Sequence, residues 1–488
     1  MNQMLRQRLA ETPNDVVALV TLGHAYLAAG LWAPAAQALG RAAVSSRDDW
    51  RAWSDYGVAQ DRCGETERAA AAFRIALVLE PGAGVASVNL ADVLFRARRY
   101  DEAARLAGRI SDDAEALVSC GNALLRIGSA PEAARRFRRG LALAPALVAT
   151  LTGLGTAHMT EERLADAGTW WRRAVTVAPD DVAVHSNLAT WYLTHGDLAR
   201  GFALYEERWR RSEAAPRRRG LPEWDGGPIA GRRLLVYQEQ GLGDALQMAR
   251  YVPELVRRGA MVELECVEAL RRLFGSLASV DHLRATGEPT SAELQAPLMS
   301  LPRLLGATLA TIPRRVPYLG AEAALVDAVA PLLPDGSPRV GLVWQGNPQQ
   351  VDEPHRSVPL AALAPLLDLP TVHFVGLQRD HGREQMQLLQ GHKNFVDLGP
   401  RLDDLATTAA VMTHLDLVVT PCTATAHLAG ALGRPVWILL KRGADWRWML
   451  ERSDSPWYPT ATLIRQRRSG DWYEVGTRVA AKLREWLA

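Results

Sequence analysis

The stretch LLVYQEQGLGDALQMARY, residues 234–251, decides the fold of the second half of the chain. It begins with an apolar run, continues through Gly241 and Gly243, and ends in residues of helical character. This order predicts a strand that ends in a glycine turn and opens directly into a helix. Many proteins bind a phosphate at such a turn, but Asp244 occupies that place here.

Asp244 argues against a phosphate at this turn. A dinucleotide fingerprint requires a third glycine, and the sequence has Leu246 in that position. A carboxylate near a helix start accepts backbone N–H bonds and suits the helix dipole, so it would compete with a bound pyrophosphate. Two interpretations stay open: Asp244 is a plain helix cap, or it is a carboxylate at the mouth of a cleft that is free to take a proton.

Strands and helices alternate through the rest of this half, which predicts parallel sheets covered on both faces. A turn-rich segment and a helix, residues 311–333, separate two series of strands. We therefore expect two facing Rossmann-like domains with the ligand site at the carboxyl ends of their strands. The expected strands are 234–238, 261–266, 282–287 and 294–299, then 339–346, 371–378, 395–399, 415–422 and 435–440.

The segment LDLVVTPCTATAHLAGALGRPVW, residues 415–437, predicts a better anion site than the first glycine turn does. Thr423, Ala424 and Thr425 would open a helix of small residues. The free N–H groups of that helix, the two hydroxyls and His427 can all donate to an anion. No carboxylate competes, because Cys422 occupies the last strand position. The alternative interpretation is a capped core helix with a buried histidine.

The first 210 residues repeat with a period of about 34 residues, which resembles the tetratricopeptide repeat and predicts paired antiparallel helices. The unit at 84–113 is four residues short. Six stacked units form a solenoid with a concave groove for a peptide or protein; the alternative is a scaffold that docks another protein or the second half of the chain. The repeat rests on three sets of positions: Gly23, Gly57, Ala91, Gly121, Gly155 and Ala189; Ala35, Ala69, Ala103, Ala133, Ala167 and Gly201; and Phe73, Phe137, Trp171 and Tyr205.

Composition and cysteine spacing fit a reducing compartment best. The 488 residues carry a formal net charge of only +2, so no strong field favours nucleic acid or a membrane. Neither a signal peptide nor a membrane span is visible, and the four cysteines lie far apart. We expect a cytoplasmic protein in which arginine runs such as 217–219 are solvated surface.

Several motifs together resemble the bacterial heptosyltransferase family of glycosyltransferases. The whole chain is similar to bacterial proteins that join tetratricopeptide repeats to such a domain, and more distantly to the O-linked N-acetylglucosamine transferases. The motifs are EQGLGD at 239–244, PLMSLPRLLG at 297–306, TATAHLAGALGRPVW at 423–437, WRWMLERSDSPWYP at 446–459 and RSGDWYEV at 468–475.

This resemblance implies an α-solenoid followed by an α/β GT-B fold. The expected parts are a repeat solenoid (1–210), a linker (211–232), an N-terminal lobe that holds the base (233–318) and a C-terminal lobe that binds the nucleotide sugar (319–488). Asp244 is the implied base, with Glu239 ranked second. The implied donor-binding residues are Arg356, Gln378, Thr423, Ala424 and His427, and Thr425 opens the same helix; Asn347, Trp344 and Trp446 are sugar-pocket candidates, the tryptophans equally core candidates. The family has an aspartate where this chain has Cys422.

The implied activity is an inverting, metal-independent glycosyl transfer from a nucleotide sugar, without a cofactor. The repeats favour a protein acceptor modified on Ser or Thr, such as a flagellin or another surface protein. Two alternatives stay open: a non-catalytic repeat scaffold with a degenerate nucleotide-binding lobe, and a transferase that acts on a saccharide or lipopolysaccharide. The sugar, the nucleotide, the acceptor and the oligomeric state do not follow from the sequence.

Overall fold

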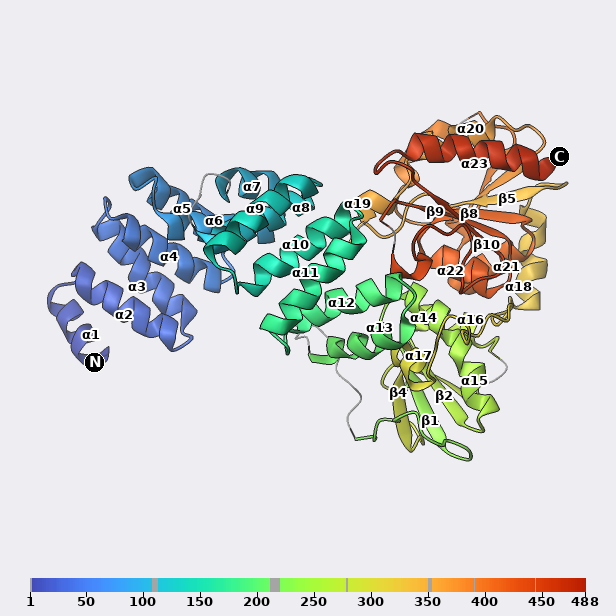
Figure 1. The fold of residues 1–488 in the computed structure, drawn as a ribbon, viewed down its shortest axis with the longest axis horizontal. Helices are drawn as coiled ribbons and strands as arrows, with labels where there is room; N and C mark the ends of the chain where they lie inside the picture. The colour runs from blue at the N-terminus through green and yellow to red at the C-terminus, as the bar shows by residue number, and fades with distance from the viewer. Residues whose placement is uncertain are drawn as a thin grey trace. The chain divides into compact units, whose positions relative to one another are not determined.

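The computed structural model describes residues 2–107, 113–210, 220–277, 280–349, 353–389, 391–443 and 445–488. The chain divides into two compact units, Met1–Val184 and His185–Ala488. The first unit is the helical solenoid and the second holds two parallel sheets (Figure 1). The expected fold class, a tetratricopeptide solenoid followed by a parallel α/β region, is confirmed, and the two parallel sheets are consistent with the GT-B type.

The solenoid is built from consecutive antiparallel helix pairs (Figure 1). Asp15, Asp49 and Asp113 accept backbone N–H bonds at the starts of first helices, as N-caps do. The helices are α1 (Asn2–Glu11), α2 (Val16–Ala28), α3 (Trp32–Ser45), α4 (Trp50–Arg62), α5 (Thr66–Leu79), α6 (Gly84–Arg96), α7 (Tyr100–Ala107), α8 (Ala114–Arg126), α9 (Ala130–Leu143), α10 (Val148–Thr160), α11 (Leu164–Val177), α12 (Val182–Thr194) and α13 (Leu198–Tyr205).

The repeated glycines make room for the repeated aromatic residues. A Cβ placed on Gly57 would lie 2.7 Å from the Phe73 ring, and one on Gly121 would lie 2.5 Å from Phe137. Real Cβ atoms do not come this close, so the glycines let the two helices of each pair approach until the ring fills their seam. Phe73 and Phe137 are buried as a result. The sequence period therefore has a direct packing cause.

The short repeat unit differs from its neighbours in its second helix. α7 spans eight residues, whereas the second helices α5 and α9 span fourteen each. The segment 108–112 that follows it lies outside the described residues, so the expected local distortion of the superhelix stays a prediction.

The second unit opens with a four-stranded parallel sheet of order β3-β2-β1-β4, which forms the N-terminal lobe. The central strand β1 is buried at four of its five positions. The strands are β1 (Arg233–Tyr237), β2 (Met261–Cys266), β3 (His282–Ala285) and β4 (Leu294–Pro297); the helices include α14 (Leu242–Met248), η2 (Ala249–Tyr251), α15 (Val252–Arg257), α16 (Glu268–Phe274) and α17 (Leu301–Leu304).

A six-stranded parallel sheet of order β10-β9-β8-β5-β6-β7 forms the C-terminal lobe. All nine expected strands are present, and β10, which pairs with β9, was not predicted. The strands are β5 (Arg339–Leu342), β6 (His373–Gly376), β7 (Phe395–Asp397), β8 (Leu417–Pro421), β9 (Val436–Leu440) and β10 (Ala461–Arg465); the helices include α18 (Ala323–Val329), α19 (Glu353–Arg356), α20 (Ala364–Leu367), α21 (Leu405–Thr413), α22 (Ala424–Ala431), η8 (Trp446–Trp448) and α23 (Trp472–Leu487).

Part of the expected linker is packed structure. Residues 211–219 lie outside the described residues, but Trp224 is buried and its N–H donates to the Gln295 carbonyl of β4 (2.8 Å). The Gln295 side chain in turn donates to the Leu221 carbonyl (2.9 Å). Residues 221–224 therefore extend the edge of the first sheet.

The last helix pair of the predicted solenoid is continuous with the second unit. The unit boundary falls inside α12, and α13 belongs wholly to the second unit. Phe202 of α13 is only 1% exposed and meets the Trp446 ring edge-on with centroids 5.6 Å apart. The aromatic face of α13 thus joins the core of the C-terminal lobe. The domain bounds inferred from sequence stay a proposal.

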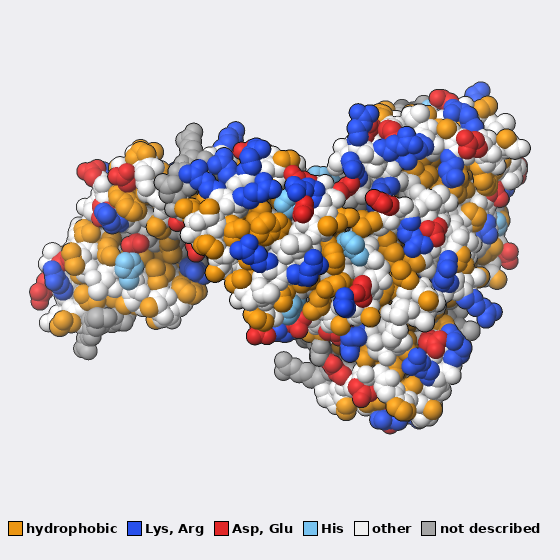
Figure 2. Space-filling model, in the orientation of Figure 1, with side chains coloured by type: hydrophobic (Ala, Val, Ile, Leu, Met, Phe, Trp, Pro, Cys, Tyr) orange, Lys and Arg blue, Asp and Glu red, His pale blue; other side chains and the backbone are white. Residues whose placement is uncertain are grey.

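Basic side chains gather on one part of the solenoid surface. Figure 2 shows Lys and Arg gathered over the part of the solenoid that contains α9. On that helix Arg135, Arg138 and Arg139 are exposed, whereas the intervening Phe137 is buried. The run follows helical periodicity, as expected for a solvated face. The run 217–219 lies outside the described residues.

Phe202→Ala should lower the unfolding free energy by about 3–5 kcal/mol, because it removes a buried aromatic side chain from the shared core. Chemical denaturation of the full chain would measure the change. Tyr473→Ala is a suitable control, since Tyr473 is 62% exposed and such a surface change costs within about 0.5 kcal/mol. Equal effects of the two substitutions would contradict the packing described for α13.

Candidate active site

The glycine turn after β1 presents Asp244 at the start of α14. Gly241 is the N-cap, and the Asp244 Oδ2 accepts its backbone N–H at 3.1 Å. This contact is the helix-capping role that the sequence left open. Only one carboxylate oxygen is used by it, and the side chain stays 24% exposed. The second oxygen is therefore available for another partner.

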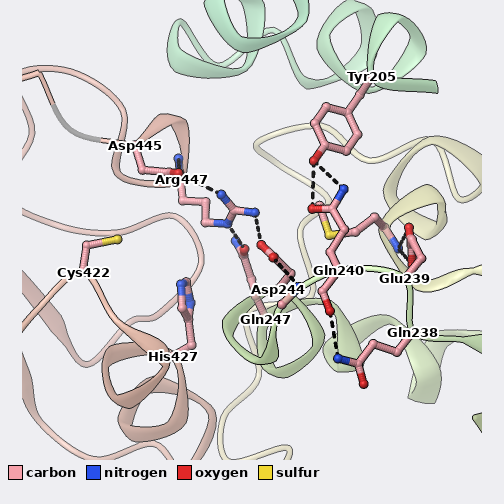
Figure 3. A network of polar contacts seen from close by, with 12 residues as sticks. Tyr205, Gln238, Glu239, Gln240, Asp244, Gln247, Cys422, His427, Asp445 and Arg447 are labelled. Carbon is pink, nitrogen blue, oxygen red and sulfur yellow. Dashed lines mark hydrogen bonds and ion pairs between the residues drawn. The ribbon is translucent and has the colours of Figure 1, made fainter. Parts of the chain in front are cut away.

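That partner is Arg447 of η8, from the other lobe (Figure 3). The Arg447 guanidinium forms an ion pair with the Asp244 Oδ1 and donates to both oxygens of Asp445 (2.9 and 3.0 Å). Its Nε donates to the Gln247 Oε1 of α14 (2.7 Å). The Arg447 side chain is only 9% exposed, so the two carboxylates neutralise a buried charge at the point where the lobes meet.

The ion pairs shift the pKa values inside this cluster. Burial raises the pKa of Asp445, but the Arg447 charge and hydrogen bonds outweigh burial and hold it below its usual value. Burial lowers the pKa of Arg447, whereas Asp445 and Asp244 raise it above its usual value overall. Arg447 therefore carries its positive charge throughout the physiological range.

The start of α22 faces the start of α14 at close range. A Cβ on Gly243 would lie 3.1 Å from the His427 Cδ2 and 3.7 Å from the Ala424 Cα. The absence of a side chain at Gly243 thus lets the two helices come together. Because each helix follows the carboxyl end of a parallel strand, this contact brings together the two strand ends where ligands of such folds bind.

The N-terminus of α22 has the properties of an anion site. Its N-cap, Thr423, makes no side-chain cap bond, although its hydroxyl is 3.1 Å from that of Thr420. The first N–H groups of a helix have no partner within it, and the helix dipole favours a negative charge there. Ala424 and Thr425 contribute these groups and are partly exposed.

His427 lies one turn into α22 and is buried. Its Nδ1 is 2.9 Å from the Tyr458 hydroxyl, and its ring stacks on Trp448 with centroids 5.3 Å apart. Burial, followed by the Arg447 charge, lowers the pKa of His427 to about 3. His427 is therefore neutral at pH 7 and adds no positive charge to the α22 start.

Cys422, the residue before the Thr423 cap of α22, contacts the same tryptophan. The Trp448 Nε1 donates to the Cys422 Sγ at 2.9 Å. Burial raises the pKa of the Cys422 thiol to about 11, so the site gains no negative charge there. An aspartate would have added one next to the α22 start.

The other expected donor residues have different surroundings. Arg356 lies at the end of α19. Its charge opposes, as a minor contribution, the burial that raises the pKa of Cys422, and it adds to the burial that lowers the pKa of His427. Gln378 is buried, and its amide bonds backbone groups of Trp344, Gln345 and His381. Its contribution to a donor site would be the shape of the loops after β5 and β6.

The sugar-pocket candidates divide into one exposed residue and two buried ones. Asn347 is exposed, and its Oδ1 accepts the Gln349 N–H (2.9 Å). Trp344 is fully buried and donates to the Gly382 carbonyl (3.0 Å). Trp446 is buried against Phe202 and Trp457. Both tryptophans therefore pack in the core, which was the alternative left open for them.

Glu239, the second candidate base, is held by an ion pair and a backbone hydrogen bond next to the glycine turn. Its side chain is 3% exposed, pairs with Arg208 of η1 (Glu206–Arg210) at 3.0 Å and accepts the Met299 N–H at 3.2 Å. The Tyr205 hydroxyl lies 3.0 Å from the Oε1 and 2.8 Å from the Nε2 of the neighbouring Gln240. The segment after α13 therefore braces the turn that carries Asp244, and Asp244 stays the better-exposed acid.

The lobes are also fastened by a buried arginine whose role the sequence did not suggest. Arg250 of η2 is 2% exposed, donates to the Trp457 carbonyl and contacts the Tyr318 hydroxyl (3.1 Å). Its guanidinium lies 4.5 Å from the centre of the Tyr458 ring, a cation–π distance. Tyr458 in turn contacts His427, so Arg250 supports the α22 side of the site.

Sequence reasoning missed Arg447, Asp445 and Gln247. The only available signal was an arginine between two tryptophans in the 446–459 motif, which suggests a buried charge. Within the described ranges, no group of three or more His, Cys, Asp or Glu side chains is arranged to hold a metal ion; the expectation of a metal-free reaction stays a prediction. No described helix is long and apolar enough to cross a membrane.

Comparison with protein families assigns both parts of the chain. Residues 368–464 match the model of glycosyltransferase family 9 (heptosyltransferase). Residues 20–84, 62–116 and 120–182 match a tetratricopeptide repeat model. The chain therefore combines tetratricopeptide repeats with a glycosyltransferase family 9 domain, which supports a glycosyltransferase. The matched range includes α22 and η8, whereas Asp244 and Arg356 lie outside it.

The chain is also similar to individual proteins. Protein FlbA of Caulobacter vibrioides is 27% identical over 324 residues, which cover 60% of this chain and 53% of FlbA. The chain thus spans about half the length of the curated relative it matches. The solved structure of YrrB, a repeat protein described as having an unusual peptide-binding site, is 17% identical; the match covers 35% of this chain and 91% of YrrB, with a TM-score of 0.30. PilF of Pseudomonas aeruginosa is also 17% identical; the match covers 40% of this chain and 90% of PilF, with a TM-score of 0.36.

Glu239 should make stability depend on pH. Burial, opposed by Arg208, raises the pKa of Glu239 from 4.5 to about 7. Between pH 4.5 and pH 7 the folded protein therefore binds more protons at Glu239 than the unfolded chain does. The stability that protonated Glu239 contributes is lost as the pH rises through this window. Relative to wild type, Glu239→Gln should gain about 3 kcal/mol between pH 4.5 and pH 8. Denaturation at both pH values measures this; a constant difference between the two proteins would refute it.

Proposed function

We propose that the protein is an inverting, metal-independent glycosyltransferase that moves a sugar from a nucleotide-sugar donor to a Ser or Thr hydroxyl of a protein acceptor. One observation carries the proposal. Asp244 and the uncapped start of α22 come together at the carboxyl ends of β1 and β8, where Gly243 lies against His427. A proton acceptor and an anion site are the two requirements of such a transfer.

The donor's diphosphate would bind at the start of α22. Thr423, Ala424 and Thr425 offer N–H and hydroxyl donors, His427 offers a neutral donor, and Arg356 adds a positive charge. The charge that develops on the leaving diphosphate would be stabilised by the helix dipole and by this arginine. Cys422 keeps a competing carboxylate out of the same place.

Asp244 would serve as the general base, with Glu239 as the less exposed alternative. The acceptor oxygen attacks the anomeric carbon and forms the new C–O bond as the bond to the diphosphate breaks. The acceptor's proton passes to the Asp244 carboxylate, and the nucleoside diphosphate leaves with the bonding electrons. A single displacement of this kind inverts the anomeric configuration.

The repeats support a protein acceptor, because tetratricopeptide solenoids present grooves that bind peptides and proteins. A flagellin or another surface protein as the acceptor, and a cytoplasmic location, stay predictions. The name of the matched family favours a second candidate, transfer to a saccharide such as lipopolysaccharide. The replacement of the family aspartate by Cys422 favours a third, a lobe that binds a nucleotide without catalysis.

Asp244→Asn should reduce transfer by about 10²–10⁴-fold, the usual range for loss of a general base. The amide keeps the size of the side chain and can still accept the Gly241 N–H, so the fold and donor binding should persist. Purified protein and candidate acceptors would be screened with a panel of nucleotide sugars, and turnover of the active pair then compared between variants. Near-normal turnover in the Asn variant would leave Asp244 a helix cap and shift attention to Glu239.

A further inference from the structure

Arg447 occupies the carboxylate oxygen of the proposed base that the helix cap leaves open. The Asp244 Oδ2 accepts the Gly241 N–H, and its Oδ1 is paired with the Arg447 guanidinium. The helix cap and the ion pair thus engage both carboxylate oxygens of Asp244. While this ion pair lasts, a hydroxyl group that approaches Asp244 competes with an arginine.

The Arg447 cluster has no excess positive charge of its own to offer an incoming diphosphate. Two carboxylates, Asp244 and Asp445, share the single guanidinium of Arg447. A diphosphate brought to the start of α22 would add at least two negative charges within the low-dielectric space between the lobes, where repulsion is strong. A second cation at the α22 start, in addition to Arg356, would offset this repulsion.

Arg447 is placed to become that second cation. Its neighbour Trp448 stacks on His427 and donates to Cys422, so η8 lies against the first turn of α22. Asp445 is two residues away on the same loop and can keep its contact with the guanidinium, whereas Asp244 belongs to the other lobe. Gln247, also bonded to Arg447, has a buried Nε2 that finds no partner among the described residues.

We infer that Arg447 is an exchangeable cation: without donor it binds Asp244, and with donor it turns to the diphosphate and releases Asp244 to act as the base. This inference rests on the proposed function. The exchange makes the base available only when the donor is present, and it transfers a positive charge to the leaving group. Arg447 would then contact the substrate directly, alongside Arg356.

The exchange predicts an unusual pattern of affinities for the full-length protein. Calorimetry would measure the binding of six ligands: UDP, GDP, ADP, CDP, dTDP and inorganic pyrophosphate, which represents the diphosphate that the five nucleotides share. Arg447→Gln should weaken the tightest of these by about tenfold or more, since a charge-assisted phosphate contact is lost. Asp244→Asn should tighten it by about three- to tenfold, because the competitor for Arg447 is gone.

The double variant separates exchange from simple repulsion. With Arg447→Gln present, the gain from Asp244→Asn should fall to about twofold or less, as expected for two residues that act through one contact. Asp61→Asn is a matched control, because it removes a carboxylate from a solenoid ion pair with Arg96 (2.6 Å) and should leave affinity unchanged. Thermal unfolding would check that each variant folds; should Arg447→Gln fail, Arg447→Lys replaces it and should retain part of the affinity and of the gain.

Unchanged or weaker binding in Asp244→Asn would overturn the exchange, and so would an equal gain in the presence and absence of Arg447. The outcome for the proposed function is separate. If none of the diphosphates binds the wild-type protein, the donor site itself is absent and both proposals fail. If a diphosphate binds the wild-type protein and its affinity does not change when Asp244 or Arg447 is replaced, only the exchange fails.

Discussion

A guanidinium buried between two lobes has to be neutralised where it lies, because an unpaired charge in a protein interior costs several kcal/mol. Arg447 meets this requirement with one carboxylate from its own loop and another from the opposite lobe. The side-chain amide of Gln247 completes its coordination. The position of Asp244, the orientation of η8 and the contact between the starts of α14 and α22 all depend on this cluster.

Small residues make the cluster possible, since charged groups from two lobes can meet only if the backbones approach closely. Gly243 brings α14 against His427, and Gly430 leaves space for the Tyr458 ring, which a Cβ would approach to 2.3 Å. Tyr458 then contacts both His427 and Arg250. The glycines of the sequence motifs therefore act through packing between the lobes rather than through phosphate binding at the first turn.

The sequence predicted the elements well and their contacts less well. Strands such as β1 and β8 are continuous apolar runs that only a buried parallel sheet explains, and the repeat glycines match aromatic residues sixteen positions later. The strand β10 was missed because its pairing with β9 follows an irregular segment that has no periodicity. Arg447 was missed because its partner Asp244 lies 203 residues away. Glu239 and Gln378 were placed correctly at strand ends, but the direction of each side chain is set by loops that local sequence does not encode.

Hydrogen–deuterium exchange with and without a bound nucleoside diphosphate tests the central claim, that the start of α22 and Asp244 belong to one donor-dependent site. The first N–H groups of α22, at Ala424 and Thr425, have no acceptor within the helix and should exchange rapidly in the free protein. Binding at this site should slow exchange in peptides that cover residues 420–430 and 445–450. Protection confined to other regions, with these peptides unchanged in the presence of saturating ligand, would contradict the account.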